Sequence, residues 1–285
     1  MKNAPKSARA TLARLTALLV LAALSASVAA GPARAQSITF TGNFNSFTST
    51  PQIMGLPNLS SPVTVNSPVT VTAPFLAVGS TGTGSVDIEG AVLNVTGATQ
   101  SCVAVAGSCI GQTATGTGTV TVNGPGAQFN TAQNFTVGGF GTGILIISNG
   151  ATVTTTLATP ILQSGADIGL RAGSSGAVTV NGAGAPPGST IWTINSSLNV
   201  GRAGTGTLTI ENGGRVVSSA SVFDNSIGDS TSGVPGFGTV TVNGPGSTWT
   251  IPDSGHNFVV GATGSGVLII ENGGEGQRQQ RDNWQ

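Results

Sequence analysis

The sequence predicts an all-β chain folded as a right-handed parallel β-helix of about seven coils. Composition, strand periodicity and an internal repeat lead to this prediction. Gly accounts for 44 of the 285 residues, charged residues for only 7%, and Tyr is absent. Thr, Ser, Asn and Val are abundant and strong helix formers are scarce, which disfavours long helices. Hydrophobic residues still make up 38% of the chain, enough apolar material for a core, which argues against intrinsic disorder.

The repeat is the most informative feature. Four segments begin with Val-Gly, at Val78, Val137, Val200 and Val260, and their starts are 59, 63 and 60 residues apart. Three sister segments begin with Ile-Gly, at Ile110, Ile168 and Ile227. Successive starts lie 27 to 33 residues apart, so the chain consists of seven half-repeats of about 30 residues, paired into units of about 60.

Each half-repeat reads as a Gly-rich stretch, a short alternating strand and an Asn-Gly turn. Leu208 and Ile210 of the strand 207–210 share one face, because side chains alternate along a strand. The equivalent inward pairs are Val86/Ile88, Val120/Val122, Leu145/Ile147, Val178/Val180, Val240/Val242 and Leu268/Ile270. The turns are expected at Asn123-Gly124, Asn149-Gly150, Asn181-Gly182, Asn212-Gly213, Asn243-Gly244 and Asn272-Gly273, since Asn and Gly tolerate positive φ.

One half-repeat has too few apolar residues to form a core alone. Stacked in register, the half-repeats give interior ladders of Val, Leu and Ile and exterior ladders of Thr and Asn, which is the logic of a solenoid. Seven coils at roughly 4.8 Å each predict a rod of about 34 Å. A β-sandwich is the alternative, because regular short strands with turn signals are typical of it too.

The N-terminus carries the pattern of an export signal. Four basic residues precede an apolar run at 15–30: Lys2, Lys6, Arg9 and Arg14. The small-residue site Ala33-Arg34-Ala35 follows, which completes the order of a secretory signal peptide. The run is shorter than the roughly 20 residues that span a bilayer, although a retained anchor is the alternative. We expect residues 1–35 to be a signal peptide cleaved after Ala35, and a mature chain without a transmembrane segment.

Segments at both ends of the repeat differ from it. Residues 36–77 carry Phe40, Phe44 and Phe47 and two copies of Ser-Pro-Val-Thr-Val, and Pro is confined to strand edges, so we expect an N-terminal cap. The β-helical repeat region is predicted at 78–274. Residues 275–285 are charged and Gln-rich, unlike anything before them, and are interpreted as an aberrant or truncated tail. The last rung, 268–270, is expected to be exposed and prone to self-association.

The charges and cysteines exclude several classes of partner. Beyond residue 35 the chain has five Arg, no Lys and ten acidic residues, a net charge of about −5, so no nucleic-acid partner is expected. Cys102 and Cys109 have six residues between them and are disulfide candidates in an exported chain, with two free thiols as the alternative. They lack the further Cys or His of a zinc site, and we expect no metal and no cofactor.

No catalytic residue is predicted. Glu211 and Glu271 occupy matching positions about 10 Å apart on the solenoid, but Ser148 fills the same position, so a solvated turn is favoured over a carboxylate pair. Asp224 and Asp229 are interpreted as turn caps. His256, near Asp253 and Ser254, does not form a triad by adjacency alone.

The remaining motifs give no sign of catalysis either. Trp192 and Trp249 are interpreted as end-of-strand packing, with a carbohydrate-stacking platform as the alternative. The Gly-x-Gly pairs each lead into a strand and not a helix, so they cradle no phosphate.

The repeat resembles that of autotransporter passengers of type V secretion and of some PEP-CTERM exported proteins of Gram-negative bacteria. The motifs that carry the resemblance are VGRAGTGTLTIENGG from Val200 and the alternating GTVTVNGPGSTW from Gly238, within 78–274. It implies an exported, adhesin-like β-helical passenger domain at the cell surface, associated with the outer membrane or secreted. The alternating strands and aromatic girdles of a translocator barrel are not found, so a fragment without its translocator, periplasmic in that case, is expected.

These observations predict a non-enzymatic surface protein with a structural or adhesive role. Its partner is expected to be an unknown surface ligand or a component of a host or neighbouring cell. A secreted β-helical glycan-active enzyme is the alternative.

Overall fold

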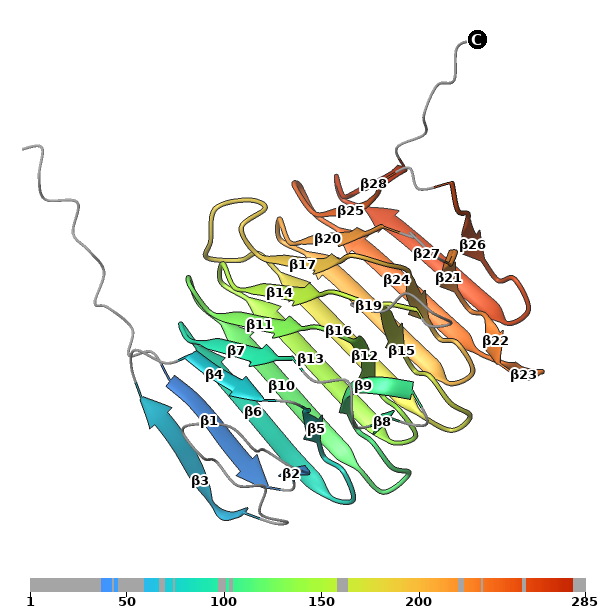
Figure 1. Cartoon of the computed structure of the whole chain (residues 1–285). Coiled ribbons are helices and arrows are strands. Elements are labelled where there is room, and N and C mark those ends of the chain that lie inside the picture. Colours follow the sequence, from blue (N-terminus) through green and yellow to red (C-terminus); the bar gives the residue numbers. More distant parts are fainter. Residues whose placement is uncertain are drawn as a thin grey trace, which may run out of the picture. The chain divides into compact units, whose positions relative to one another are not determined.

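The structure is a computed structural model that describes residues 37–42, 44–45, 59–66, 70–73, 75–96, 101–102, 105–157, 164–219, 223–231, 233–252 and 255–278. Within these ranges the regular structure is β-strand, arranged in three long sheets (Figure 1). This part of the chain contains no helix of the length and apolarity that a membrane crossing requires. The predicted signal peptide, 1–35, and its cleavage site at Ala35 lie outside the described residues.

Each sheet collects one strand from every coil. Sheet 1 contains β1 (Ser37–Gly42), β3 (Leu59–Asn66), β6 (Thr83–Glu89), β10 (Thr117–Asn123), β13 (Thr142–Ser148), β16 (Ser175–Asn181), β19 (Thr205–Glu211), β24 (Phe237–Asn243) and β27 (Ser265–Glu271). Sheet 2 contains β4 (Thr70–Ala73), β7 (Val92–Val95), β11 (Gln128–Thr131), β14 (Thr152–Thr155), β17 (Ile191–Ile194), β20 (Arg215–Ser218), β25 (Thr248–Ile251) and β28 (Glu275–Arg278). Sheet 3 contains β2 (Phe44–Asn45), β5 (Ala77–Val78), β9 (Val105–Ile110), β12 (Asn134–Val137), β15 (Ala166–Ile168), β18 (Leu198–Val200), β21 (Asn225–Ile227) and β26 (Phe258–Val260).

Two short pairings lie beside these sheets. The strand β8 (Ser101–Cys102) pairs antiparallel with β9. A small hairpin joins β22 (Ser230–Thr231) to β23 (Val234–Pro235).

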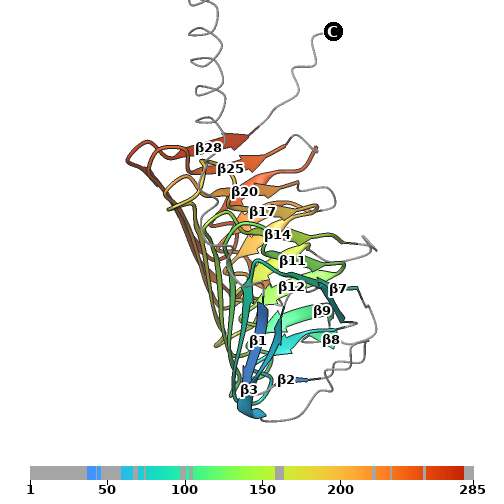
Figure 2. The ribbon, with the colours of Figure 1, turned by 90° about the vertical axis from the view of Figure 1, so that its left-hand side faces the viewer.

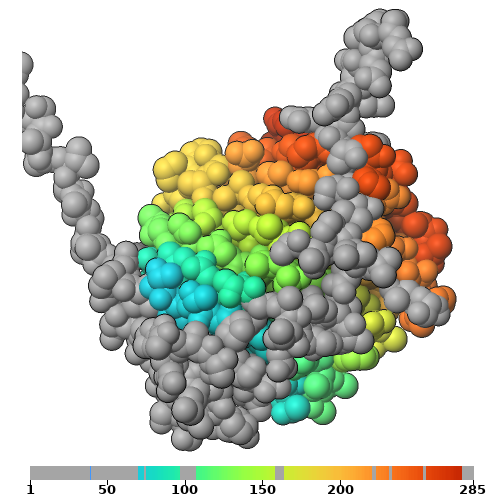
Figure 3. All heavy atoms as spheres, in the orientation of Figure 1, coloured from blue at the N-terminus to red at the C-terminus, as the bar shows by residue number. Residues whose placement is uncertain are grey.

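The chain passes from sheet 1 to sheet 2 to sheet 3 and then begins the next coil. Neighbouring strands from successive coils are parallel and in register, so that Leu208 of β19 lies opposite Val178 of β16 and Val240 of β24. Figure 2 shows the sheet 2 strands from β7 to β28 stacked one above another, and successive coils form successive colour bands in Figure 3. The parallel β-helix is therefore confirmed, with each half-repeat as one coil, and the β-sandwich alternative is wrong.

The core is a set of apolar ladders along the helix axis. Both predicted inward residues of each sheet 1 strand from β6 to β24 are at most 1% exposed, as the period-2 pattern predicted. Sheet 2 contributes larger side chains, including Phe129, Trp192 and Trp249. The Trp192 indole Nε1 donates to Thr155 Oγ1 at 3.3 Å, and Trp249 Nε1 donates to Ser218 Oγ at 2.9 Å. Both rings are buried, which confirms their packing role and excludes a carbohydrate-stacking platform there.

The Val-Gly and Ile-Gly signatures mark the corner between sheet 3 and the next coil of sheet 1. Gly201 has a φ of +72°, and a Cβ there would lie 2.2 Å from the carbonyl oxygen of Phe237 in the following coil. Only glycine combines a left-handed backbone with such a close approach of two coils. The corner geometry thus explains why a Gly follows Val or Ile in every half-repeat.

The turns between sheets 1 and 2 are of two kinds. Asn149, Asn212 and Asn272 adopt φ values of 52° to 56° and are each followed by a Gly with positive φ, as predicted. The sister coils differ from the prediction: in the described chain Asn123, Asn181 and Asn243 are not among the positive-φ residues, and neither is Gly182. There the reversal uses two glycines around a Pro, as in Gly244 (φ 89°) and Gly246 (φ 76°). The reason is that Pro fixes φ near −65°, so the left-handed positions move to its neighbours.

The two ends of the stack are built differently from its middle. At the N-terminal end β1 is antiparallel to both β6 and β3, but β4 and β5 already pair in parallel with coil strands. At the other end β28 pairs in parallel with β25, so the stack continues beyond Gly274 to Arg278. The described strands of the parallel stack therefore run from Thr70 to Arg278. Its last coil exposes Val267, Ile269 and Ile270 by 39% to 48%.

Candidate functional site

A polar ladder runs along the corner where sheet 1 strands end. Its members occupy one register position in successive coils: Glu89, Asn123, Ser148, Asn181, Glu211, Asn243 and Glu271. Asn123 Nδ2 donates to both carboxylate oxygens of Glu89 at 3.0 Å, and Asn181 Nδ2 donates to Glu211 Oε1 at 2.7 Å. Alternating carboxylates with amides lets neighbouring coils hydrogen-bond instead of repelling each other.

This ladder determines what Glu211 and Glu271 can do together. Asn243 lies between them in register, so the two carboxylates are two coils, or about 10 Å, apart. Glycosidase carboxylates act at separations of about 5 to 9.5 Å. The geometry thus favours the turn-ladder interpretation of these two residues over an acid–base pair.

Asp224 and Asp229, which were predicted to cap turns, lie on either side of β21 in sheet 3. Asp224 Oδ1 accepts a hydrogen bond from the backbone N–H of Asn257 at 2.7 Å and lies 3.8 Å from His256 Nδ1. Asp224 therefore links two successive coils. Asp229 Oδ1 accepts from the backbone N–H of Ser230 at 2.7 Å, as a local cap would, and from Thr263 Oγ1 at 3.1 Å. Asp253 and Ser254 lie outside the described residues.

A second polar ladder lies on the outward face of sheet 3. One residue of each strand directly precedes the Val or Ile of the signature: Cys109, Thr136, Asp167, Asn199 and Ser226. All five are buried. Burial of a polar ladder is tolerated when its members hydrogen-bond to each other.

Asp167 is the centre of this ladder. Its Oδ2 accepts from Ser164 Oγ at 2.7 Å and from Asn134 Nδ2 at 3.1 Å, while its Oδ1 accepts from Asn199 Nδ2 at 2.9 Å. The Arg202 guanidinium lies 3.5 Å from Oδ1, and its side chain remains 32% exposed. The buried Asp167 carboxylate thus accepts hydrogen bonds from residues of three coils. It also lies beside the partly exposed guanidinium of Arg202.

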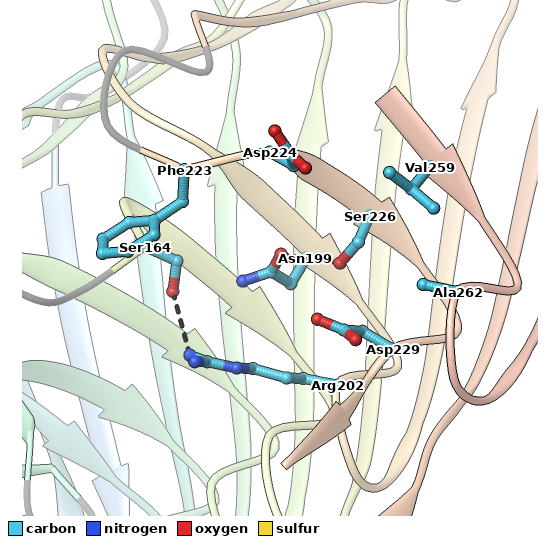
Figure 4. A pocket seen from close by; sticks show the side chains of 9 residues that line it. All are labelled: Ser164, Asn199, Arg202, Phe223, Asp224, Ser226, Asp229, Val259 and Ala262. Atoms are coloured by element: carbon cyan, nitrogen blue, oxygen red, sulfur yellow. Dashed lines mark hydrogen bonds between the residues drawn. The ribbon is translucent and has the colours of Figure 1, made fainter. Parts of the chain in front are cut away.

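A pocket of about 270 Å³ opens above this network. It is lined by Ser164, Asn199, Arg202, Phe223, Asp224, Ser226, Asp229, Val259 and Ala262. Four successive coils contribute to it, and Figure 4 shows their side chains around one space with the Arg202–Ser164 hydrogen bond dashed. We call it the sheet 3 pocket.

Sequence reasoning missed the sheet 3 pocket. In the sequence, Asp167 and Arg202 contribute only to the net charge, and no motif includes Phe223. The signal that could have found them is the residue before each Val-Gly or Ile-Gly, which reads Cys, Thr, Asp, Asn, Ser and Val from Cys109 to Val259. Aligning the half-repeats on the signature places these residues in one column.

The described cysteines are oxidised, and the described chain has no cluster of metal ligands. Cys109 is disulfide-bonded, and no described cysteine is a free thiol. The backbone of Cys102 in β8 pairs with Val105 of β9, while its side chain lies outside the described residues, so the pairing stays a prediction. Among the side chains that the structure describes, no three His, Cys, Asp or Glu residues are grouped as metal ligands.

Comparisons with family models, with curated proteins and with solved structures found no match for this chain.

Proposed function

We propose that this chain is an exported, non-enzymatic surface protein: a passenger-like β-helix with a structural or adhesive role. The observation that carries the proposal is that nearly all of the described chain forms one β-helical stack. From Thr70 to Arg278 the described strands build one continuous stack of coils, and a hydrogen-bonded polar ladder follows the corner where the sheet 1 strands end. Such an architecture holds an extended surface in fixed register, which suits display and contact.

Export is supported by the sequence pattern at 1–35 and by the resemblance of the repeat to type V secretion passengers. The Cys109 disulfide is consistent with this compartment, because disulfides persist in oxidising environments outside the cytosol. The low charge of the chain, 7%, also fits a contact surface of hydroxyl and amide groups.

The hydrogen bonds that three carboxylates accept from neighbouring coils support a role without catalysis. Glu89 and Glu211 accept hydrogen bonds from amides of neighbouring coils, and Asp167 is buried among three donors. General acid–base work needs a carboxyl group that can reach a substrate. These three carboxylates instead hold successive coils together.

The test is expression of the full chain in a Gram-negative host, followed by fractionation and N-terminal sequencing. The proposal predicts a mature protein that begins at Gln36, found outside the inner membrane, and an increase in attachment of the cells to mammalian or bacterial surfaces when the protein is displayed. Uncleaved protein retained in the cytosol contradicts export. Displayed protein that promotes no attachment and no cell–cell aggregation contradicts the adhesive role.

The enzyme alternative is tested with the same purified protein on polysaccharides such as pectins. We expect no release of reducing ends or unsaturated products, either from the natural chain or from Glu211→Gln. Product release that Glu211→Gln or Glu271→Gln abolishes would contradict the proposal.

A further inference from the structure

The sheet 3 pocket has the features of a built site. Its floor is a buried network in which Asn199 donates to Asp167 at 2.9 Å and accepts from Ser226 Oγ at 2.7 Å. These contacts cross three coils and fix the side chains that face the pocket. A pocket whose polar groups are positioned in advance loses little entropy on binding.

Arg202 supplies hydrogen-bond donors to the pocket. Its contacts with Asp167 Oδ1 and Ser164 Oγ are both 3.5 Å, longer than the 2.7 to 2.9 Å of a strong charge-assisted bond. A guanidinium carries five N–H donors in a fixed plane, and these two long contacts leave most of that capacity for a ligand.

Asp224 and Asp229 supply acceptors. Each uses Oδ1 for a backbone N–H at 2.7 Å. Asp224 Oδ2 also accepts from Asn257 Nδ2 at 3.5 Å, and Asp229 Oδ1 from Thr263 Oγ1 at 3.1 Å. A carboxylate offers about four acceptor positions over its two oxygens, so each keeps acceptor positions for a ligand. Phe223, 38% exposed, adds an aromatic ring to the same lining. The pocket therefore combines planar donors, paired acceptors and one apolar face.

This combination matches a neutral sugar ring. Neighbouring hydroxyls of a sugar accept from a guanidinium and donate to a carboxylate, while the C–H face of the ring packs against an aromatic side chain. Formal charges in the lining are one positive, Arg202, and two negative, Asp224 and Asp229, so an anionic ligand such as a uronate or a phosphate is disfavoured. The volume, about 270 Å³, lies just below the range of roughly 300 to 1,000 Å³ for drug-sized ligands, which suits one ring.

We propose that the sheet 3 pocket binds a neutral hexose unit of a surface glycan. The inference deepens the adhesive role proposed above and rests on it for the source of the glycan. It places recognition at a side face of the β-helix, at a point that four coils build together.

The experiment measures binding of glucose, galactose and mannose to the purified full chain by saturation-transfer NMR and titration calorimetry, with glucuronate as the charged comparison. We expect at least one neutral hexose to bind and glucuronate to bind more weakly. Arg202→Gln should weaken binding by about tenfold or more, the usual effect of removing a hydrogen bond to a charged group. Phe223→Ala should weaken it several-fold.

Two matched controls lie outside the pocket. Phe140→Ala removes another exposed ring, which is 45% exposed, and Arg215→Gln removes a half-buried Arg of sheet 2. Both should leave binding unchanged. Because Arg202 contacts the buried Asp167, its variant is checked for folding by circular dichroism, and Phe223→Ala tests the proposal independently of that contact.

The inference is overturned if none of the three hexoses binds at up to about 50 mM, if glucuronate binds best, or if Phe223→Ala binds like the natural chain. Failure of this inference is distinguishable from failure of the proposed function. Cells that attach through displayed protein while Phe223→Ala attaches equally well would retain the adhesive role and remove this site from it.

Discussion

The ladder of buried apolar residues in sheet 1 predicts how much a cavity lowers the free energy of unfolding at different positions along the stack. Leu208 is fully buried, with Val178 and Val240 opposite it in the coils before and after. Leu→Ala substitutions in such sites cost about 2.7 to 5 kcal/mol, because a cavity remains after the lost transfer energy. Leu268 occupies the same register position in the last described coil, is only partly buried and packs against the core from one side.

We therefore expect Leu208→Ala to lower the free energy of unfolding by about 3 kcal/mol or more and Leu268→Ala by less than about 1.5 kcal/mol. The outward Thr209→Ala on the same strand as Leu208 is the control, and its effect should stay within about 1 kcal/mol. Urea unfolding followed by circular dichroism gives the three values, provided that the slope with denaturant stays constant. Equal losses for Leu208→Ala and Leu268→Ala would refute the ladder as the source of stability.

Three further predictions concern the corner, the disulfide and the last coil. Gly201→Ala places a Cβ against the Phe237 carbonyl at a φ of +72°. We therefore expect the free energy of unfolding in urea to fall by more than about 2 kcal/mol. Asn212→Gly, at a φ that Gly adopts freely, is the control and should cost under about 1 kcal/mol. Reduction with dithiothreitol should lower stability by about 2 to 3 kcal/mol if Cys109 closes the short loop to Cys102, and an unchanged urea midpoint would contradict that pairing. Ile270→Lys places a charge on the exposed last rung, where Ile270 is 46% exposed, and should reduce oligomers in light scattering; oligomers that persist unchanged point to another contact surface.

The sequence was most informative about positions that the period of a strand determines. Leu208 and Ile210, for example, alternate with Thr and Glu along their strand, and their burial follows from that alternation alone. Asn212 likewise has the positive φ that its place before two glycines predicted.

The site was harder to predict because it depends on which residues face each other across coils. Arg202 and Asp167 are 35 positions apart, and Phe223 follows a connection of irregular composition, so no local pattern relates them. The aromatic residues illustrate the same limit. The place of Trp249 after a strand predicted its packing, and Trp249 is buried, whereas no repeat position indicated that Phe223 lies at the surface.

The stacking of one half-repeat per coil underlies both the core and the sheet 3 pocket, and distances between spin labels test it most directly. Thr121 and Thr241 are four coil steps apart in register, Asp87 and Thr241 five, and Asp87 and Ile269 six. With Cys substitutions labelled at each pair, double electron–electron resonance should give mean distances that rise by about 4.8 Å per step, from about 19 to about 29 Å. Distances that do not increase in this order, or that change by much more than one strand spacing per half-repeat, would contradict the account.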